Sequence, residues 1–379
     1  MGGSSNDLSL TYHDVAAARL ERLWPALFGE PCPVSARSRL DAMVLPWGAA
    51  RIPRAPAWPS DIGDDHSPYE FSIAFDPHGP PSLRFLCEAQ GATPTLDDTR
   101  SAALTTTARF GREVGVDLQR FEQVRDLFLP DVPNARFLLW HAATLSGKSE
   151  VKAYFNPQIA GKERQFELVE QAMRVLGFES AWPTLLHSVQ RSPTADDEIR
   201  YFALDLNGGK TARMKVYLYQ RGITTEHLER MAAACDGYTP GELTEFCRAM
   251  TDSTGPYTAF PLCTYLSFIE GNPLPNDVTV QIPIRFYASN DAVARDRISR
   301  YMRSRGIDHR PYEASLTALA PRALEDGPGL NTYASLRAGR ARVTIYIATE
   351  LFSATPHVPM GLQKAAFRQS SVPAPGKIP

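Results

Sequence analysis

The sequence predicts an α+β protein in which ten antiparallel strands close into a barrel ringed by helices. The first observation is a repeat: the motifs "KAY", "KVY", "TVQ" and "TIY" begin at residues 152, 215, 279 and 344, at steps of 63, 64 and 65 residues. The second is turn chemistry ahead of each motif, such as "LSGKS" and "NGGK", which indicates hairpins. The third is helix-like sequence between successive hairpins. Five ααββ repeats therefore place every helix on one face of a single sheet.

Each repeat supplies one hairpin, whose two strands can be assigned in chain order. The first strands are expected at 69–75, 135–144, 199–206, 259–269 and 330–337. The second strands lie in "SLRFLCEAQ", "EVKAYFNP", "RMKVYLY", "TVQIPIR" and "RVTIYIATE". Apolar residues recur at helical spacing between the hairpins, among other places in 161–177, 224–235 and 291–306.

Alternation along the second strands indicates which face is which. In "TARMKVYLY", Lys215 and Tyr217 share one face, and Val216 and Leu218 share the other. The apolar face is expected to pack on the helices, so the polar and aromatic face lines a chamber inside the barrel. For a single strand, the alternative is the solvated side of an open sheet. The recurrence of Lys or Arg beside Tyr favours the chamber.

Composition restricts the class of protein. The net charge of −2 provides no general basic field, so we expect no nucleic-acid partner. No apolar run approaches the roughly 20 residues that span a bilayer, and no signal peptide is recognisable, so we expect no membrane partner. Five widely spaced cysteines without a C-x-x-C pair are typical of reduced thiols in a cytoplasmic protein.

The chain of 379 residues is expected to form one domain. That domain is predicted over 11–365, with disordered tails at 1–10 and 366–379. The protein is expected to be a monomer or a homodimer.

The polar strand faces carry four cations, Arg84, Lys152, Arg213 and Lys215. Inside a barrel they would repel one another unless a multiply charged anion lay between them. A diphosphate fits, because each charge-assisted hydrogen bond contributes roughly 1.5–3 kcal/mol. The interleaved aromatic rings, which can stabilise a carbocation and exclude water, are Tyr154, Tyr217 and Tyr346. Cations for a leaving diphosphate and rings for the remaining carbocation are typical of prenyl transfer.

Glu70 is a lone carboxylate on the polar face of the first strand. It can accept a hydrogen bond from a substrate N–H, which enriches an aromatic ring for electrophilic attack. An ion pair with one of the arginines is the alternative interpretation.

Six motifs together resemble the dimethylallyltryptophan synthase family of indole prenyltransferases: "DDHSPYEFS", "LRFLCEAQG", "VKAYFNP", "RMKVYLY", "TVQIPIR" and "RVTIYIATE". They follow in the family's order from about residue 60 to residue 352, and "KAYFNP" and "VQIPIR" are similar to its bacterial branch. The resemblance implies the ααββ-repeat (ABBA) prenyltransferase barrel around a solvent-filled lumen. It also implies a Friedel–Crafts alkylation of an indole by dimethylallyl diphosphate, without a metal ion or other cofactor.

The resemblance also implies roles for single residues. Glu70 would accept the indole N–H. The diphosphate ligands would be Arg84, Lys152, Arg213 and Lys215, and we expect Gln281 and Arg285 to join them. The shield around the allyl cation would be Tyr154, Tyr217 and Tyr346. The substrate pocket is expected to include Trp140, His141, Thr279 and Tyr333, although a packed tryptophan and a satisfied histidine are the alternative for the first two.

This chain departs from the fungal members of the family at three positions. They often have tyrosine at the position of Gln281, glutamine at Thr279 and tyrosine at Asn156, so the shield here is partly amide and hydroxyl. Fungal members can also place a lysine on the strand before "VKAYF", which this chain lacks. The acceptor of the final ring proton is therefore left open.

Other patterns do not support a different chemistry. "AATLSGKS" (142–149) resembles a phosphate-binding P-loop, but a strand rather than a helix follows its lysine. The acidic pairs lack the spacing of an Asp-Asp-x-x-Asp magnesium site, and the histidines lack that of a zinc site, so we expect no metal.

Two classes of function follow. The first is prenylation of L-tryptophan or a small derivative in secondary metabolism, with a tryptophan-containing peptide, a cyclic dipeptide or another indole or phenol as alternative acceptors. The second is a non-catalytic barrel that binds an anionic lipid, which would explain the basic lumen but neither Glu70 nor the tyrosine spacing.

Overall fold

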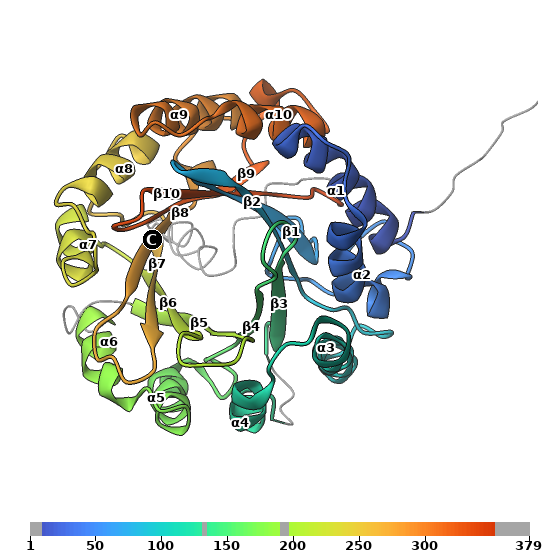
Figure 1. Ribbon diagram of the computed structural model, residues 1–379, viewed down its shortest axis with the longest axis horizontal. Helices are drawn as coiled ribbons and strands as arrows, with labels where there is room; N and C mark the ends of the chain where they lie inside the picture. Colours follow the sequence, from blue (N-terminus) through green and yellow to red (C-terminus); the bar gives the residue numbers. More distant parts are fainter. Residues whose placement is uncertain (1–9, 131–134, 190–196, 353–379) are drawn as a thin grey trace, which may run out of the picture.

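The strands of all five repeats lie in one closed barrel with the helices around it (Figure 1). The computed structural model describes residues 10–130, 135–189 and 197–352. Apart from Leu10, the predicted tails 1–10 and 366–379 lie outside the described residues, as do residues 353–365 of the predicted domain. The predicted order of two helices and a hairpin is confirmed in every repeat.

The first repeat contains α1 (Tyr12–Phe28), α2 (Val34–Gly48), β1 (Tyr69–Asp76) and β2 (Gly79–Cys87). The second contains α3 (Leu96–Arg109), α4 (Gln119–Phe128), β3 (Leu139–Thr144) and β4 (Val151–Phe155). The third contains α5 (Gln165–Val175), α6 (Trp182–Val189), β5 (Asp197–Asp205) and β6 (Arg213–Gln220). The fourth contains α7 (Thr225–Ala232), α8 (Glu242–Thr251), β7 (Leu262–Ile269) and β8 (Asp277–Ile282). The fifth contains α9 (Asp291–Ser304), α10 (Arg310–Leu319), β9 (Asn331–Arg337) and β10 (Arg342–Ile347).

Pairing between β1 and β10 closes the barrel. Every other pair joins strands that are consecutive in the chain, and all pairs are antiparallel. Ser72 on β1 lies opposite Tyr346 of β10 on one side and opposite Arg84 of β2 on the other. Among the described strands none is left with an unpaired edge, which removes the usual route to aggregation of a sheet.

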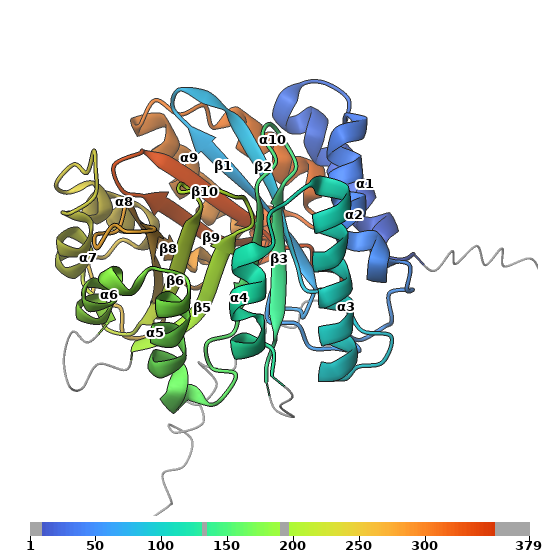
Figure 2. The ribbon, with the colours of Figure 1, turned by 60° about the horizontal axis from the view of Figure 1, so that its bottom comes forward.

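The outer face of the barrel is apolar, as the alternation predicts. Phe155 on β4 and Phe202 on β5 point outward, and Phe128 of α4 packs between them with ring centroids 5.0 and 5.1 Å apart. All three side chains are fully buried. Figure 2 shows α4 and α5 standing against the outside of these strands. The core that holds the fold together therefore lies between barrel and helices, which leaves the lumen for polar groups.

Helix starts follow the local sequence. Thr11, Thr95 and Asn290 each accept a hydrogen bond from the backbone N–H three residues later, at 3.1, 3.2 and 2.9 Å. Such caps satisfy N–H groups that have no partner within the helix. None of the described helices is both long and apolar enough to cross a membrane.

One strand ends earlier than its polar pattern suggests. β8 stops at Ile282, because Pro283 has no N–H to donate to a neighbouring strand. The chain then forms a 3₁₀ turn, η4 (Ile284–Phe286), which carries Arg285. The prediction that Arg285 continues the strand face of Gln281 is therefore wrong, and its side chain takes a different direction.

Removing the ring of Phe128 tests the importance of the outer core. Phe128→Ala leaves a cavity between α4 and the barrel, and we expect it to lower the free energy of unfolding by about 3–5 kcal/mol, measured by urea denaturation. Val175→Ala, at a side chain that is 44% exposed, is the control and should change the value by less than about 0.5 kcal/mol. Equal effects of the two variants would contradict this account of the core.

Candidate active site

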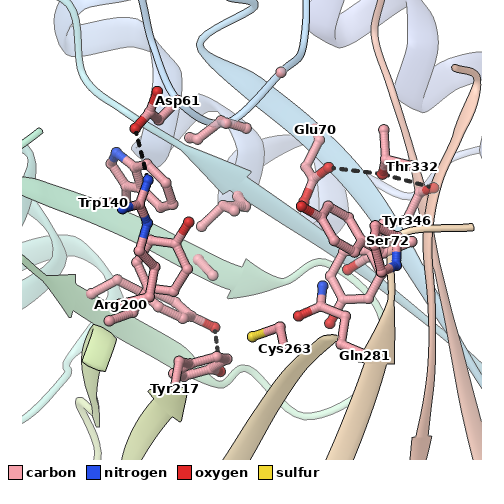
Figure 3. A pocket seen from close by; sticks show the side chains of 18 of the residues that line it. Asp61, Glu70, Ser72, Trp140, Arg200, Tyr217, Cys263, Gln281, Thr332 and Tyr346 are labelled. Carbon is pink, nitrogen blue, oxygen red and sulfur yellow. Dashed lines mark hydrogen bonds and ion pairs between the residues drawn. The ribbon is translucent and has the colours of Figure 1, made fainter. Parts of the chain in front are cut away.

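A cavity runs along the inside of the barrel, and all ten strands contribute to its wall (Figure 3). The expected site residues that line it are Glu70, Arg84, Trp140, Lys152, Tyr154, Tyr217, Gln281, Arg285, Tyr333 and Tyr346. The inward orientation of the polar strand face is therefore confirmed.

One end of the lumen holds a group of basic side chains, here called the cationic cluster: Arg84, Lys152, Arg213, Lys215, Arg337 and Arg342. Four of them were expected, and two were not. Arg337 of β9 lies directly opposite Arg342 of β10 in the barrel register. Both follow the same inward alternation as Tyr333 and Tyr346, so the pattern that found the tyrosines also contains the two arginines.

Three carboxylates partly neutralise the cationic cluster. Asp205 lies 2.8 Å from Lys152 Nζ and 2.6 Å from Arg213 Nε. Glu150 lies 3.3 Å from Lys152 and 3.4 Å from Arg213, and Asp277 lies 3.7 Å from Arg337. A fourth carboxylate, Asp76, acts on Arg342 from a greater distance, so the six basic groups outnumber the carboxylates around them.

The pKa values of this end reflect burial and mutual repulsion. Burial raises the pKa of Asp205, but Lys152 and Arg213 outweigh it and hold that pKa well below its usual range. Burial lowers the pKa of Lys215 well below its ordinary value, and the neighbouring Arg337 and Lys152 lower it further. The cluster is therefore short of negative charge, and a bound anion would stabilise its protonated form.

A belt of tyrosine rings lies next to the cluster. Tyr217 stacks on Tyr265 with ring centroids 4.5 Å apart, and lies 5.7 Å from Tyr154 and 5.8 Å from Tyr201. Lys215 Nζ lies 5.3 Å from the centre of the Tyr265 ring, which links the belt to the cationic cluster. Tyr201 and Tyr265 were not predicted, because they lie on the first strands of their hairpins, where the repeat is less regular.

Glu70 occupies the other end of the lumen. Its side chain is buried, and the Thr332 hydroxyl lies 3.5 Å from its Oε2 (Figure 3). Burial raises the pKa of Glu70 to about 8, while nearby Arg285 lowers it and Asp64 raises it. β9 connects the two ends of the lumen, with Thr332 near Glu70 and Arg337 in the cationic cluster.

Arg285 lies at the Glu70 end and not in the cationic cluster, so its predicted role as a diphosphate ligand is wrong. The guanidinium pairs with Asp64, donates to the Thr332 carbonyl at 3.0 Å and lies 4.7 Å from the centre of the Tyr333 ring. The cause is the end of β8 at Pro283, which places Arg285 on the turn beyond the strand.

The wall across the cavity from Glu70 combines aromatic rings with charged groups (Figure 3). Trp140 packs on Tyr201 with ring centroids 5.1 Å apart. Beside them, Arg200 lies 3.7 Å from Asp61 (Figure 3). Arg136 lies 3.5 Å from the same carboxylate. Sequence reasoning missed the three charged residues. Asp61 lies in a loop, Arg136 lies before the observed start of β3 at Leu139, and Arg200 sits at a shift in the β5 register.

His141 does not face the lumen, so its assignment to the substrate pocket is wrong and the alternative of a hydrogen-bonded histidine in the core holds. Its Nε2 lies 2.8 Å from the Thr107 hydroxyl of α3, and its ring meets Phe110 edge-on at 5.3 Å. Burial lowers the pKa of His141 to about 3, so the ring is neutral near pH 7. Consecutive residues of a strand face opposite sides, and Trp140 takes the inward position.

Thr279, Arg213 and Lys215 lie on the inner face of the barrel but do not line the main cavity. Thr279 is buried on β8, opposite Tyr265 on one side and Arg337 on the other. It therefore packs beneath the belt and does not contribute to the open pocket. Within the described part of the chain, no three His, Cys, Asp or Glu side chains are placed to hold a metal ion.

Comparison with known families identifies the barrel. The family model described as tryptophan dimethylallyltransferase matches residues 40–315. The chain belongs to this family. It is thus a prenyltransferase enzyme with the ABBA fold, and the resemblance noted in the sequence is confirmed.

Solved structures of bacterial enzymes are similar over nearly the whole chain. A 6-dimethylallyl tryptophan synthase is 34% identical with a TM-score of 0.84, covering 93% of this chain and 99% of that one. The 6-dimethylallyltryptophan synthase of Micromonospora olivasterospora, solved in complex with DMASPP and Trp, is 33% identical with a TM-score of 0.83, covering 92% and 99%. The 5-dimethylallyltryptophan synthase of Streptomyces coelicolor is 28% identical with a TM-score of 0.81, covering 91% and 99%.

Asp205 offers a test of charge balance in the prenyltransferase lumen. Asp205→Asn leaves Lys152 and Arg213 without their buried partner, and we expect a loss of about 3–5 kcal/mol in the free energy of unfolding. Because the pKa of Asp205 is depressed in the folded protein, the stabilisation is complete above the unfolded value of about 3.9 and is lost as the pH falls further. The difference between variant and wild type, measured by urea denaturation, should narrow below about pH 4.

The control for this variant is Asp308→Asn, which removes a surface ion pair with Arg310 and should leave stability nearly unchanged. Added pyrophosphate should stabilise Asp205→Asn more than wild type, because the anion replaces the lost charge. A variant as stable as wild type would show that Asp205 does not balance the cluster.

Proposed function

We propose that this prenyltransferase transfers the dimethylallyl group of dimethylallyl diphosphate to the indole ring of L-tryptophan or a small derivative, without a metal ion, in secondary metabolism. The observation that carries the proposal is the order of groups along one lumen. The cationic cluster lies at one end, Glu70 at the other, and the tyrosine belt between them. The similar Micromonospora enzyme is described with DMASPP and Trp bound, which supports this pair of substrates.

The cationic cluster is suited to hold the diphosphate. A diphosphate monoester carries roughly three negative charges near neutral pH, and the cluster contains more basic groups than carboxylates. Fixed cations stabilise the charge that grows on a departing diphosphate. In many isoprenoid enzymes a divalent metal meets that need, so the charge balance supports a reaction without one.

The tyrosine belt is suited to the allyl cation. When the bond between the allyl carbon and its oxygen breaks, the electron pair leaves with the diphosphate and a carbocation remains. Tyr154 and Tyr217 line the space beside the cluster, and Tyr265 stacks on Tyr217. Aromatic rings at this place stabilise a cation electrostatically and exclude water. Tyr346 and the amide of Gln281 complete the wall.

Glu70 is suited to raise the nucleophilicity of the indole. Its carboxylate can accept a hydrogen bond from the indole N–H, so that electron density moves into the ring as a ring carbon attacks the allyl cation. A carbon–carbon bond forms, and the ring then releases the proton from the attacked carbon to a base. The Thr332 hydroxyl lies 3.5 Å from Glu70 Oε2 and 3.2 Å from the Tyr346 carbonyl, so a polar group flanks the carboxylate.

The charged wall beside Trp140 favours a free amino acid over a neutral cyclic dipeptide. Arg136 and Arg200 surround Asp61, so the same patch offers positive groups for a carboxylate and a negative group for an ammonium. Tryptophan carries both, while a cyclic dipeptide carries neither. This complementarity supports tryptophan as the acceptor.

At the level of the whole protein, we propose one catalytic domain over 11–365 and a cytoplasmic location. The five cysteines are free thiols, which supports a reducing compartment. The monomeric or homodimeric state stays a prediction.

Incubation with dimethylallyl diphosphate and L-tryptophan tests the reaction directly. We expect a product heavier by one dimethylallyl group in mass spectrometry, with an equal rate in the presence of EDTA. A tryptophan cyclic dipeptide should react more slowly, because it cannot use Arg200 and Asp61. A product that forms only after magnesium is added would refute the metal-free reaction, and no product with any indole would refute the proposed function.

Lys215→Ala separates an enzyme from a non-catalytic carrier barrel. Loss of a buried cation in the cluster should raise the KM for dimethylallyl diphosphate about tenfold and also lower kcat about tenfold or more, because the same charge is needed as the diphosphate leaves. Steady-state kinetics and calorimetric binding of the donor measure the two effects. Lys210→Ala, at an exposed lysine in the turn before β6, should behave as wild type. A loss of affinity with no turnover in any variant would favour the carrier.

A further inference from the structure

Arg285 lies near two carboxylates that come from different parts of the chain. Asp64 belongs to the loop before β1, Glu70 to β1 itself, and Arg285 to the turn after β8. Arg285 is 7% exposed, so it sits in a medium where charges act strongly on one another. The sequence pattern had assigned it to the diphosphate, and its position beside Glu70 requires a different explanation.

The guanidinium of Arg285 is held in place on several sides. Asp64 pairs with its Nε, and its Nη1 donates to the Thr332 carbonyl at 3.0 Å. The guanidinium carbon lies 4.5 Å from the centre of the Phe286 ring and 4.7 Å from that of Tyr333. These contacts fix the cation near Glu70, and among the described residues its ion pair is with Asp64 and not with Glu70. The expectation that Glu70 forms an ion pair with an arginine is therefore not met.

The oxygens of Glu70 thus remain available to a ligand. The groups that act on its carboxyl are the Thr332 hydroxyl on β9, Arg285 on the turn and Asp64 in the loop. Burial raises the pKa of the Tyr346 phenol on β10, and Glu70 in turn raises it further. Leu86, which is apolar, lies opposite Glu70 on β2. Of the two charged groups, Arg285 favours the ionised carboxylate and Asp64 opposes it.

We propose that Asp64 and Arg285 are a pair of positioning residues for the reaction: Arg285 favours the ionised form of Glu70 against the effect of burial, and Asp64 holds Arg285 back so that Glu70 stays free to accept the indole N–H. This inference rests on the proposed function. An ionised carboxylate is the stronger acceptor and gives the greater increase in ring nucleophilicity, whereas a direct Arg285–Glu70 ion pair would occupy the oxygens that the indole needs.

The pair makes opposite predictions for its two members. Arg285→Gln removes the cation that favours ionised Glu70. In a plot of kcat/KM for the acceptor against pH, the fall at low pH (the acid limb) should therefore move to higher pH by about one unit or more. Asp64→Asn removes the opposing carboxylate and releases Arg285 toward Glu70, so the limb should move to lower pH while the KM for tryptophan rises. Arg285→Lys keeps the charge and should restore most of the wild-type limb.

A matched control has the same chemistry elsewhere in the barrel. Arg297 on α9 pairs with Asp252 and donates to the Met250 and Tyr287 carbonyls at 2.7 and 2.8 Å, so it repeats the contacts of Arg285 outside the lumen. Arg297→Gln should leave the limb where it is in wild type, whatever it does to the melting temperature. Circular dichroism melts show which variants are folded before their kinetics are compared.

An infrared titration of Glu70 supplies a readout without turnover. The carboxyl band that is lost in Glu70→Gln identifies Glu70. Because a histidine has no carboxyl band, this signal distinguishes the titration of Glu70 from that of His66, which also lines the cavity. The midpoint should rise in Arg285→Gln and fall in Asp64→Asn. The inference would be overturned if Arg285→Gln and Asp64→Asn had the same infrared midpoint and the same acid limb of kcat/KM as wild type. A shift in the same direction in both variants would also overturn it. An inactive wild type with shifted midpoints would instead place the failure in the proposed function.

Discussion

The gathering of six cations around one lumen, two of them buried and four partly buried, is the constraint on which the rest of this structure depends. Separate, unpaired burial of so many charges is prohibitively costly. Asp205, Glu150 and Asp277 neutralise part of the charge, and the remaining excess is complementary to a substrate with several negative charges. A closed barrel is the architecture that brings the cations together, because they arise from five strands: β2, β4, β6, β9 and β10.

The same closure separates stability from chemistry. Outward side chains such as Phe155 and Phe202 pack beneath the helices and form the core. Inward side chains such as Lys152 and Tyr217 come from the same or neighbouring strands yet face the cavity. Because the two sets alternate along each strand, a change in lumen polarity need not disturb the apolar layer. This division explains how a barrel without an apolar interior is stable, and it leaves the inner positions free to determine the reaction.

Much of the fold and part of the site could be predicted from the sequence, since both follow from a period of about 65 residues and from strand alternation. The errors have local causes. Arg285 was assigned to a strand that Pro283 ends, and the choice between Trp140 and His141 as the inward residue was open because the register of β3 was unknown. Arg337 and Arg342 lie at the ends of strands read for their tyrosines. Pairings such as Arg285 with Asp64 join segments that are far apart in the chain. The repeat of about 65 residues predicts where the strands lie, but it does not predict which side chains of distant loops will pair.

The pairing of β1 with β10 also has a consequence for biosynthesis. It joins Phe71 of the first strand to Ile347 of the last. A ribosome must therefore release nearly all five repeats before the last hydrogen-bonded ladder can form. Such long-range contacts slow folding, and partly made chains expose strand edges that complete chains do not. Until that ladder forms there is no enclosed lumen, and water and counterions screen the basic side chains. The repulsion among the basic side chains of the lumen therefore arises in the final step of folding. By then the apolar layers of the earlier repeats can already have assembled.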